Sequence, residues 1–160
     1  DHMVSLGLLG GKIQRMEAVT NKNVSIVSGG FDPLHVGHVE LFYKAKDLSS
    51  KLIVVVNTDE FLTRKKSKPF MPMKERIAIV NSLKPVDIVI PSIDRDHTVC
   101  ETLKMIRDTY APKWDLCFCN GGDRTSGENT PEHALCEEIG ITPIYGLGDK
   151  IQSSSWLIKT

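Results

Sequence analysis

Two histidines, His35 and His38, stand three positions apart in segment 29–38, which reads Gly-Gly-Phe-Asp-Pro-Leu-His-Val-Gly-His. A neutral imidazole donates one hydrogen bond and a protonated one adds a positive charge, so such a pair suits chemistry at a phosphate group. Three glycines accompany the pair: Gly29, Gly30 and Gly37. Because glycine lets the backbone approach a ligand closely, we expect the segment to bind a phosphate chain.

The histidines lie between two segments of different periodicity. Residues 24–28 form a short run of strand length rich in β-branched side chains, and residues 39–48 carry apolar side chains at helical spacing. The pair therefore stands where a strand ends and a helix begins. The first turn of a helix leaves backbone N–H groups unpaired and its dipole favours negative charge, so this junction is expected to bind an anion.

The rest of the chain alternates strand-like and helix-like segments. Residues 52–56 are a continuous apolar run, typical of a strand buried on both faces. Further strands are expected at 86–90, 116–119 and 142–145, and helices at 73–83, 98–110 and 131–139. This order predicts an α/β fold, a Rossmann-like open sheet of about five parallel strands with helices on both faces. Ligands of such sheets bind at the carboxyl ends of the strands near the topological switch point, where His35 and His38 are expected.

The composition is that of an ordinary globular domain and argues against two classes of partner. Of 160 residues, 41% are hydrophobic and 25% are charged, with 20 basic and 20 acidic side chains. This length and apolar content predict one domain, and the zero formal net charge predicts no nucleic-acid and no membrane partner. No apolar stretch approaches the roughly 18 residues of a membrane span.

The cysteines and the N-terminus add two expectations. The four cysteines lack the paired spacing of a zinc site, so we expect buried reduced thiols, no protein metal site and a cytoplasmic compartment. The chain begins Asp-His-Met, which resembles a cloning scar, and the weakly patterned stretch that follows shows no link to the first strand. Residues 1–18 are therefore expected to be a tag or disordered extension, and residues 19–160 a single domain.

Segment 35–38, with Phe31 and Asp32 before it, resembles the HxGH signature of the cytidylyltransferase-like nucleotidyltransferases. This group includes glycerol-phosphate and phosphoethanolamine cytidylyltransferases and the adenylyltransferase half of ADP-heptose synthase. Further segments resemble motifs of the family in the family's order: 56–61 (STDEF), 74–76 (a helix-opening arginine), 86–90 (VDEVI), 121–123 (GGD) and 153–155 (STT). The resemblance covers residues 24–159, nearly the whole chain.

The resemblance implies an enzyme that transfers a nucleoside monophosphate from CTP or ATP to a phosphorylated small molecule and releases pyrophosphate. The acceptor would be a polyol, sugar or amino-alcohol phosphate. His35 and His38 would stabilise the transition state, and Lys65, in the basic loop 63–69, would bridge the two reacting phosphates, with Lys66 and Lys68 as alternatives. The implied nucleotide-binding residues are Gly29, Gly30, Phe31, Asp32, Gly37, Arg76, Gly121, Asp123, Ser153, Ser154 and Ser155.

The resemblance also implies Mg²⁺ and a homodimer. The ion would be bound mainly through the nucleotide phosphates, with Asp32 in reach through water. Two departures from the family leave CTP or ATP open: Arg124 stands where glycerol-phosphate cytidylyltransferases have a tryptophan, and Lys84 and Pro85 replace a family arginine. Two other functions also stay open, a nucleotide sensor without turnover and an adenylyltransferase of the nicotinamide or pantetheine phosphate type.

Overall fold

Five parallel strands form the centre of the molecule in the computed structural model, which describes residues 22–66, 68–121 and 130–147. The strands are β1 (Asn23–Gly29), β2 (Lys51–Val56), β3 (Ile88–Pro91), β4 (Asp115–Gly121) and β5 (Thr142–Leu147). Their order in the sheet is β3-β2-β1-β4-β5. The chain builds outward from β1 to β3 and then returns to the other side of β1, so the topological switch point lies between β1 and β4.

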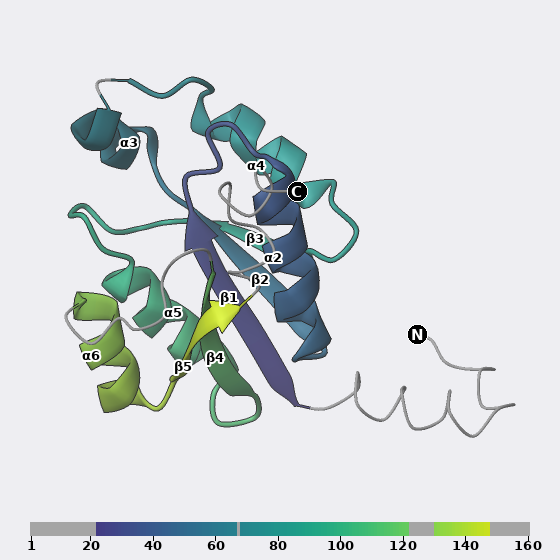
Figure 1. The fold of residues 1–160 in the computed structure, drawn as a ribbon. Helices are drawn as coiled ribbons and strands as arrows, with labels where there is room; N and C mark the ends of the chain where they lie inside the picture. Colours follow the sequence, from purple (N-terminus) through teal and green to yellow (C-terminus); the bar gives the residue numbers. More distant parts are fainter. Residues whose placement is uncertain (1–21, 67, 122–129, 148–160) are drawn as a thin grey trace, which may run out of the picture.

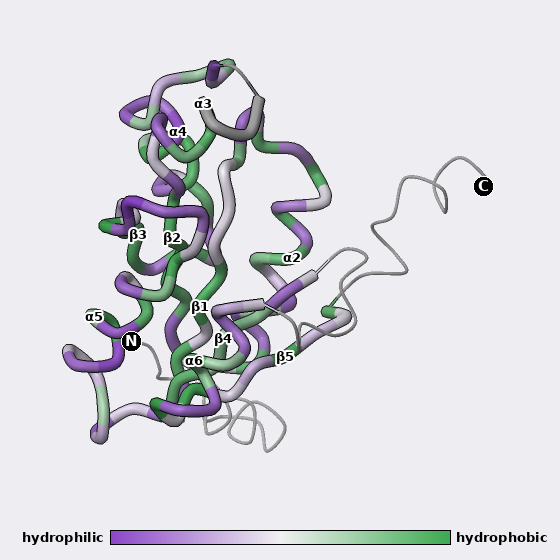
Figure 2. Tube along the Cα trace, turned by 90° about the vertical axis from the view of Figure 1, so that its left-hand side faces the viewer, coloured by the Kyte–Doolittle hydropathy of each residue, from purple (hydrophilic) through white to green (hydrophobic). Residues whose placement is uncertain are grey.

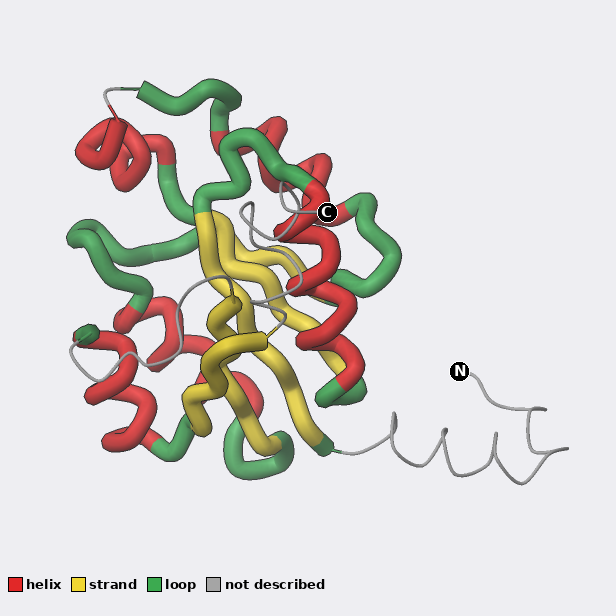
Figure 3. The backbone as a smooth tube through the Cα atoms, in the orientation of Figure 1, coloured by secondary structure: helices red, strands yellow, loops and turns green. Residues whose placement is uncertain are grey.

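Helices cover both faces of this sheet (Figures 1 and 3). They are α2 (Val36–Asp47), α4 (Met73–Asn81), α5 (Cys100–Tyr110) and α6 (Pro131–Ile139), whereas α3 (Asp59–Lys66) lies beyond the carboxyl ends of the strands. One core packs Phe42 of α2 and Val80 of α4 against the sheet, and a second packs Leu103 of α5 and Leu135 of α6 against the opposite face. The sheet is therefore the middle layer of three, and Figure 2 shows hydrophobic stretches along its central strands β1 and β2.

The apolar run of β2 explains why one sheet serves both cores. Residues 52–56 are all fully buried. Because side chains alternate between the two faces of a strand, Leu52 and Val54 join the core under α2 and α4, whereas Ile53 and Val55 join the core under α5 and α6. The expected Rossmann-like fold of five parallel strands is confirmed.

One segment differs from expectation. The basic segment 63–69, expected as an extended loop, is helical as far as Lys66 and forms the second half of α3. The Thr58 hydroxyl accepts a hydrogen bond from the Phe61 N–H at 3.0 Å, and Asp59 and Glu60 stand in the first turn. Capping and acidic residues at the start, with basic residues at the end, stabilise a short helix, and these end signals outweigh the exposed basic composition.

The extension expected over residues 1–18 lies outside the described residues. Within the ranges that the structure describes, no helix is both long and apolar enough to cross a membrane.

Candidate active site

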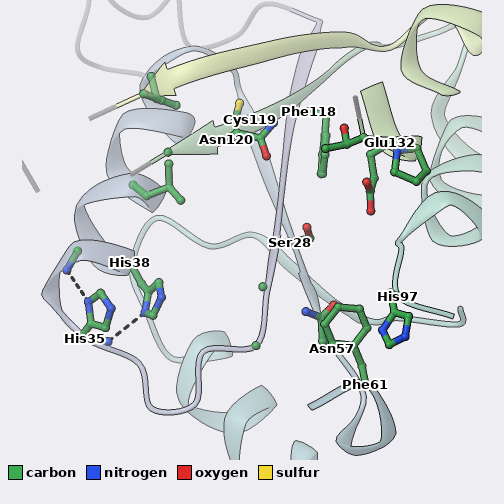
Figure 4. Close-up of a pocket in the computed structure, with 18 residues that line it drawn as sticks. Ser28, His35, His38, Asn57, Phe61, His97, Phe118, Cys119, Asn120 and Glu132 are labelled. Atoms are coloured by element: carbon green, nitrogen blue, oxygen red, sulfur yellow. Dashed lines mark hydrogen bonds between the residues drawn. The ribbon is translucent and has the colours of Figure 1, made fainter. Parts of the chain in front are cut away.

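A cavity of about 600 Å³ opens at the carboxyl ends of the strands (Figure 4). Its lining comes from the ends of β1, β2, β4 and β5, the first turns of α2 and α6, α3 and the loop between β3 and α5. This size suits a small-molecule ligand, since such pockets typically enclose roughly 300–1,000 Å³. The cavity lies at the switch point, where the sequence places His35 and His38, and both histidines line it.

The two histidines cap the N-terminus of α2 and each other's backbone. His35 is the N-cap residue, and its Nδ1 accepts a hydrogen bond from the Gly37 N–H at 3.1 Å. His38 Nδ1 in turn accepts from the His35 N–H at 3.1 Å, which completes a reciprocal capping box. The rings stack with centroids 3.8 Å apart. Capping and ligand binding are compatible here, because each ring uses only one of its two nitrogens for the cap.

These bonds also decide which ring nitrogen carries hydrogen. A backbone N–H can only donate, so Nδ1 of His35 and Nδ1 of His38 must both be unprotonated acceptors. In a neutral imidazole the hydrogen then lies on Nε2, which the cap leaves unused. The histidine end of the cavity therefore offers two Nε2–H donors beside the N-terminus of α2, whose first turn contains no acidic residue.

Aromatic packing holds His38 in place and keeps it neutral. Phe31 is 4% exposed and meets the His38 ring edge to face at 5.0 Å, while its other side packs on Phe42 at 5.3 Å. Burial, with a smaller contribution from the neighbouring His35, lowers the pKa of His38 to about 4. Phe31 adopts a φ of 52°, an uncommon left-handed conformation for a bulky residue, in the connection between β1 and α2.

Three glycines of the site lie so close to neighbouring atoms of the chain that a larger side chain would collide with them. A Cβ atom at Gly29 would lie 2.9 Å from the Phe31 ring, and one at Gly121 would lie 2.9 Å from the Leu147 carbonyl oxygen. A Cβ at Gly30 would meet the Leu62 side chain at 2.8 Å. Gly29, Gly30 and Gly121 line the cavity, as does Gly37. Their predicted contacts with a nucleotide remain predictions.

Arg76 connects two backbone segments that line the cavity, one after β1 and one after β2. It is 1% exposed, and its guanidinium donates to the carbonyl oxygens of Gly30 at 2.9 Å, Asn57 at 2.8 Å and Met71 at 2.9 Å. It also pairs with the Asp59 carboxylate at 2.6 Å. Arg76 thus fixes the backbone after β1 to the backbone after β2, and a direct contact with nucleotide stays a prediction.

Asp32 is likewise engaged by the chain. Its carboxylate oxygens accept from the Phe70 N–H at 2.6 Å and from the Met71 N–H at 2.7 Å. Phe31, Asp32 and Arg76, three of the predicted nucleotide-binding residues, do not line the cavity. Phe31 packs on His38, and Arg76 bonds to the Gly30 and Asn57 carbonyls, so these two contact residues that do line it. Within the described ranges, no group of three or more histidine, cysteine or acidic side chains could hold a metal ion.

Four residues on the wall away from the histidines are absent from the predicted catalytic and nucleotide-binding residues: Asn57, Phe61, His97 and Glu132. They come from the end of β2, from α3, from the loop before α5 and from the first turn of α6. In Figure 4 the Glu132 side chain is directed into the cavity, with Asn57, Phe61 and His97 below it. Asn57 and Phe61 fall in segment 56–61, which resembles a family motif, but the fold brings them beside His97 and Glu132.

The remaining predicted residues are only partly described. Lys65 lies in the last turn of α3, and the structure does not describe its side chain. Asp123, Ser153, Ser154 and Ser155 lie outside the described residues.

The cysteines are free thiols, as expected. Cys119 and Cys136 are buried, whereas Cys100 and Cys117 are only partly buried. Cys117 and Cys119 share one face of β4 with their Sγ atoms 3.8 Å apart, and Cys119 lines the cavity. The hydrogen bond with Cys117, together with burial, raises the pKa of Cys119 far above its usual range, so this thiol stays protonated.

Comparison with known proteins gives one family and several relatives. Residues 26–140 match the family model described as cytidylyltransferase-like. A FAD synthase from Methanopyrus kandleri is 40% identical over 86 residues, which are 51% of this chain and 56% of that protein. A glycerol-3-phosphate cytidylyltransferase from Bacillus subtilis is 41% identical over 66 residues, 41% of this chain and 51% of that protein.

A bifunctional protein HldE from Sulfurimonas denitrificans is 39% identical over 90 residues, 55% of this chain and 18% of that protein. The chain thus spans about half the length, or less, of these curated relatives. Among solved structures, a lipopolysaccharide core biosynthesis protein from Thermoplasma volcanium matches with a TM-score of 0.62 and 22% identity, covering 79% of this chain and 96% of that one. At this identity the structural likeness shows the fold alone.

Proposed function

The chain belongs to the cytidylyltransferase-like family, and we propose that it is a nucleotidyltransferase that joins a nucleoside monophosphate from CTP or ATP to a phosphorylated small molecule. An oxygen of the acceptor phosphate attacks the α-phosphorus of the nucleotide. A new phosphorus–oxygen bond forms, the bond to the bridging oxygen breaks, and pyrophosphate leaves with the electron pair. Such a reaction needs positioned donors rather than a protein nucleophile.

The observation that carries this proposal is the pair of Nε2–H donors on His35 and His38. Both point away from their capping bonds, beside a helix N-terminus without acidic residues, on the wall of a cavity of about 600 Å³. Negative charge that develops on the transferring phosphate would strengthen hydrogen bonds from these donors. Removal of one such donor typically costs about 10²–10³ in kcat.

Other residues complete the proposal through the family resemblance. Lys65 would bridge the acceptor phosphate and the α-phosphate. Gly121 and Asp123 would contact the base and ribose, and Ser153, Ser154 and Ser155 the leaving pyrophosphate. Mg²⁺ is commonly held by substrate phosphates and water, so its binding would not depend on a protein cage, and it would screen the charge of the triphosphate.

Nucleotide choice and assembly belong to the same proposal. The replacement of a tryptophan by Arg124 and of an arginine by Lys84 and Pro85 removes two side-chain contacts available to a glycerol-phosphate cytidylyltransferase. We expect weaker discrimination between CTP and ATP than in such an enzyme, which competitive nucleotide binding would measure. We also expect a homodimer, which light scattering would detect.

Pyrophosphate release tests the proposed function. CTP and ATP are each combined with Mg²⁺ and a panel of polyol, sugar and amino-alcohol phosphates. Flavin mononucleotide is included, since the FAD synthase relatives are named for a product that joins this phosphate to AMP. The proposal predicts release that requires both a nucleotide and one acceptor class. Nucleotide binding without release for any pairing would contradict it and favour a sensor.

A further inference from the structure

The wall of the cavity away from the histidines contains a buried hydrogen-bond acceptor without a partner. Asn57 is 8% exposed, and its backbone is fixed at both ends, by a bond from its N–H to the Gly29 carbonyl at 2.9 Å and by the bond from Arg76 to its own carbonyl. Its side-chain Oδ1 is buried and has no hydrogen-bond partner among the described residues. An unpaired buried acceptor costs free energy, so this position favours a ligand that supplies a donor.

Glu132 places a negative charge on the same wall. Among the described residues that line the cavity it is the one with a carboxylate, and none of them is a lysine or arginine. One carboxylate oxygen accepts from the Val99 N–H at 3.1 Å, which fixes the orientation of the side chain. Figure 4 shows this carboxylate directed into the cavity. A fixed carboxylate repels a phosphate, and it therefore favours a part of the ligand that carries positive charge.

Two aromatic rings complete this wall. Phe61 and His97 meet edge to face with centroids 6.1 Å apart, and both line the cavity. An ammonium group is attracted both to a carboxylate and to the face of an aromatic ring, and its three N–H bonds need acceptors. A neutral hydroxyl would satisfy the acceptors but would bring no full positive charge to Glu132, which among the described residues otherwise meets only the partial charge of the α6 N-terminus and the Val99 N–H.

We propose that Glu132 and Asn57 select an acceptor that carries a primary ammonium group at the end opposite its phosphate. The phosphate lies toward His35 and His38, and the ammonium donates to the Glu132 carboxylate and the Asn57 side-chain oxygen beside Phe61 and His97. This inference rests on the proposed function, and it narrows the acceptor to an amino-alcohol phosphate.

Two acceptors of equal length test the inference. The kinetics of 2-aminoethyl phosphate and 2-hydroxyethyl phosphate are measured with the unaltered chain, with Glu132→Gln and with Glu138→Gln. The glutamine keeps an oxygen for the Val99 N–H, and Glu138 is an exposed residue of the same helix that does not line the cavity. We expect the unaltered chain to prefer the amine, and Glu132→Gln to lower kcat/KM for the amine about tenfold or more while changing the hydroxyl compound little. Glu138→Gln should change neither.

Three results would overturn the inference: a preference of the unaltered chain for the hydroxyl compound, an equal loss for both acceptors in Glu132→Gln, or a raised KM for the nucleotide instead. Calorimetric binding of 2-aminoethyl phosphate separates this failure from that of the proposed function. Binding about tenfold weaker in Glu132→Gln than in the unaltered chain would support the site even if no pyrophosphate were released. Equal binding to both chains would contradict it.

Discussion

Two helix N-termini reach the same cavity, and they are built differently. Helix α2 has no acidic residue in its first turn, and its caps are the Nδ1 atoms of His35 and His38. Helix α6 is capped by the Thr130 hydroxyl, which accepts from the His133 N–H at 3.2 Å, and carries Glu132 in its first turn. The positive end of the α6 dipole is therefore already met by a carboxylate of its own, whereas that of α2 is left for a ligand.

The comparison of these two helices shows that a helix N-terminus at a pocket is not in itself a phosphate site. The end at α2 presents donors, two Nε2–H groups and a helix dipole, and suits the phosphates. The end at α6 presents acceptors, Glu132 and the unpaired oxygen of Asn57, and suits donors or positive charge. A substrate with a phosphate at one end and a hydrogen-bond donor at the other would match both.

The largest effect is expected at Arg76, which ties the two ends together through the Gly30 and Asn57 carbonyls. Arg76→Met would leave these buried acceptors and the Asp59 carboxylate unpaired, and we expect a loss of about 3–5 kcal/mol in the free energy of unfolding. Urea denaturation measures it, with the exposed Arg95→Met as the control. A loss no larger than that of the control would mean that the connection contributes little.

The donor end is tested next by His38→Ala. Losing one Nε2–H donor that acts in the transition state should lower kcat about 10² or more while the fold remains intact. His133→Ala serves as the control, because His133 bonds to Tyr145 outside the cavity lining. Unchanged turnover in His38→Ala would remove the phosphate role from this end.

A smaller contrast is expected within α3. Lys65→Ala should lower kcat and kcat/KM together, and Lys66→Ala much less, because successive residues of a helix point about 100° apart and only one of them can face the cavity. Steady-state kinetics of the two variants decide. Equal and mild effects would mean that both lysines are surface charge.

The smallest effect concerns pH. The pKa of His38 is about 4 in the folded protein, below its ordinary value of 6.5, so the unfolded chain binds more protons between these values. The stabilising contribution is present above pH 6.5 and is lost as the pH falls toward 4. Urea denaturation across this range should show falling stability, with a flatter profile in His38→Gln. The same slope in both proteins would assign the pH dependence to other groups.

The sequence predicts those parts of the fold and of the candidate site that depend on neighbouring residues along the chain. The strand, the glycines and the helix around His35 and His38 follow one another in the sequence, so the position of these histidines at the carboxyl ends of the strands could be predicted. The run of basic residues at 63–69 predicts a loop, whereas the Thr58 cap and the acidic first turn favour the helix α3 that the structure shows. Asn57 lies in segment 56–61, which resembles a family motif, but its meeting with His97 and Glu132 arises through the fold, and no spacing along the chain relates these three residues.

Arg76 shows the reverse case. Its position at the start of a helix matched a family arginine, and the sequence favoured a nucleotide contact. Its burial and its bonds to the Gly30, Asn57 and Met71 carbonyls are long-range, and they became visible only in three dimensions.

We propose that His35 and His38 each present Nε2–H toward the phosphates. Nitrogen-15 NMR of the imidazoles, recorded at neutral pH without and with nucleotide, tests it most directly. Both rings should carry hydrogen on Nε2 and not on Nδ1 in the free protein, because each Nδ1 accepts a backbone hydrogen bond, and nucleotide should shift the Nε2 signals. A free protein with hydrogen on Nδ1 of either ring, or Nε2 signals that ignore the nucleotide, would contradict it.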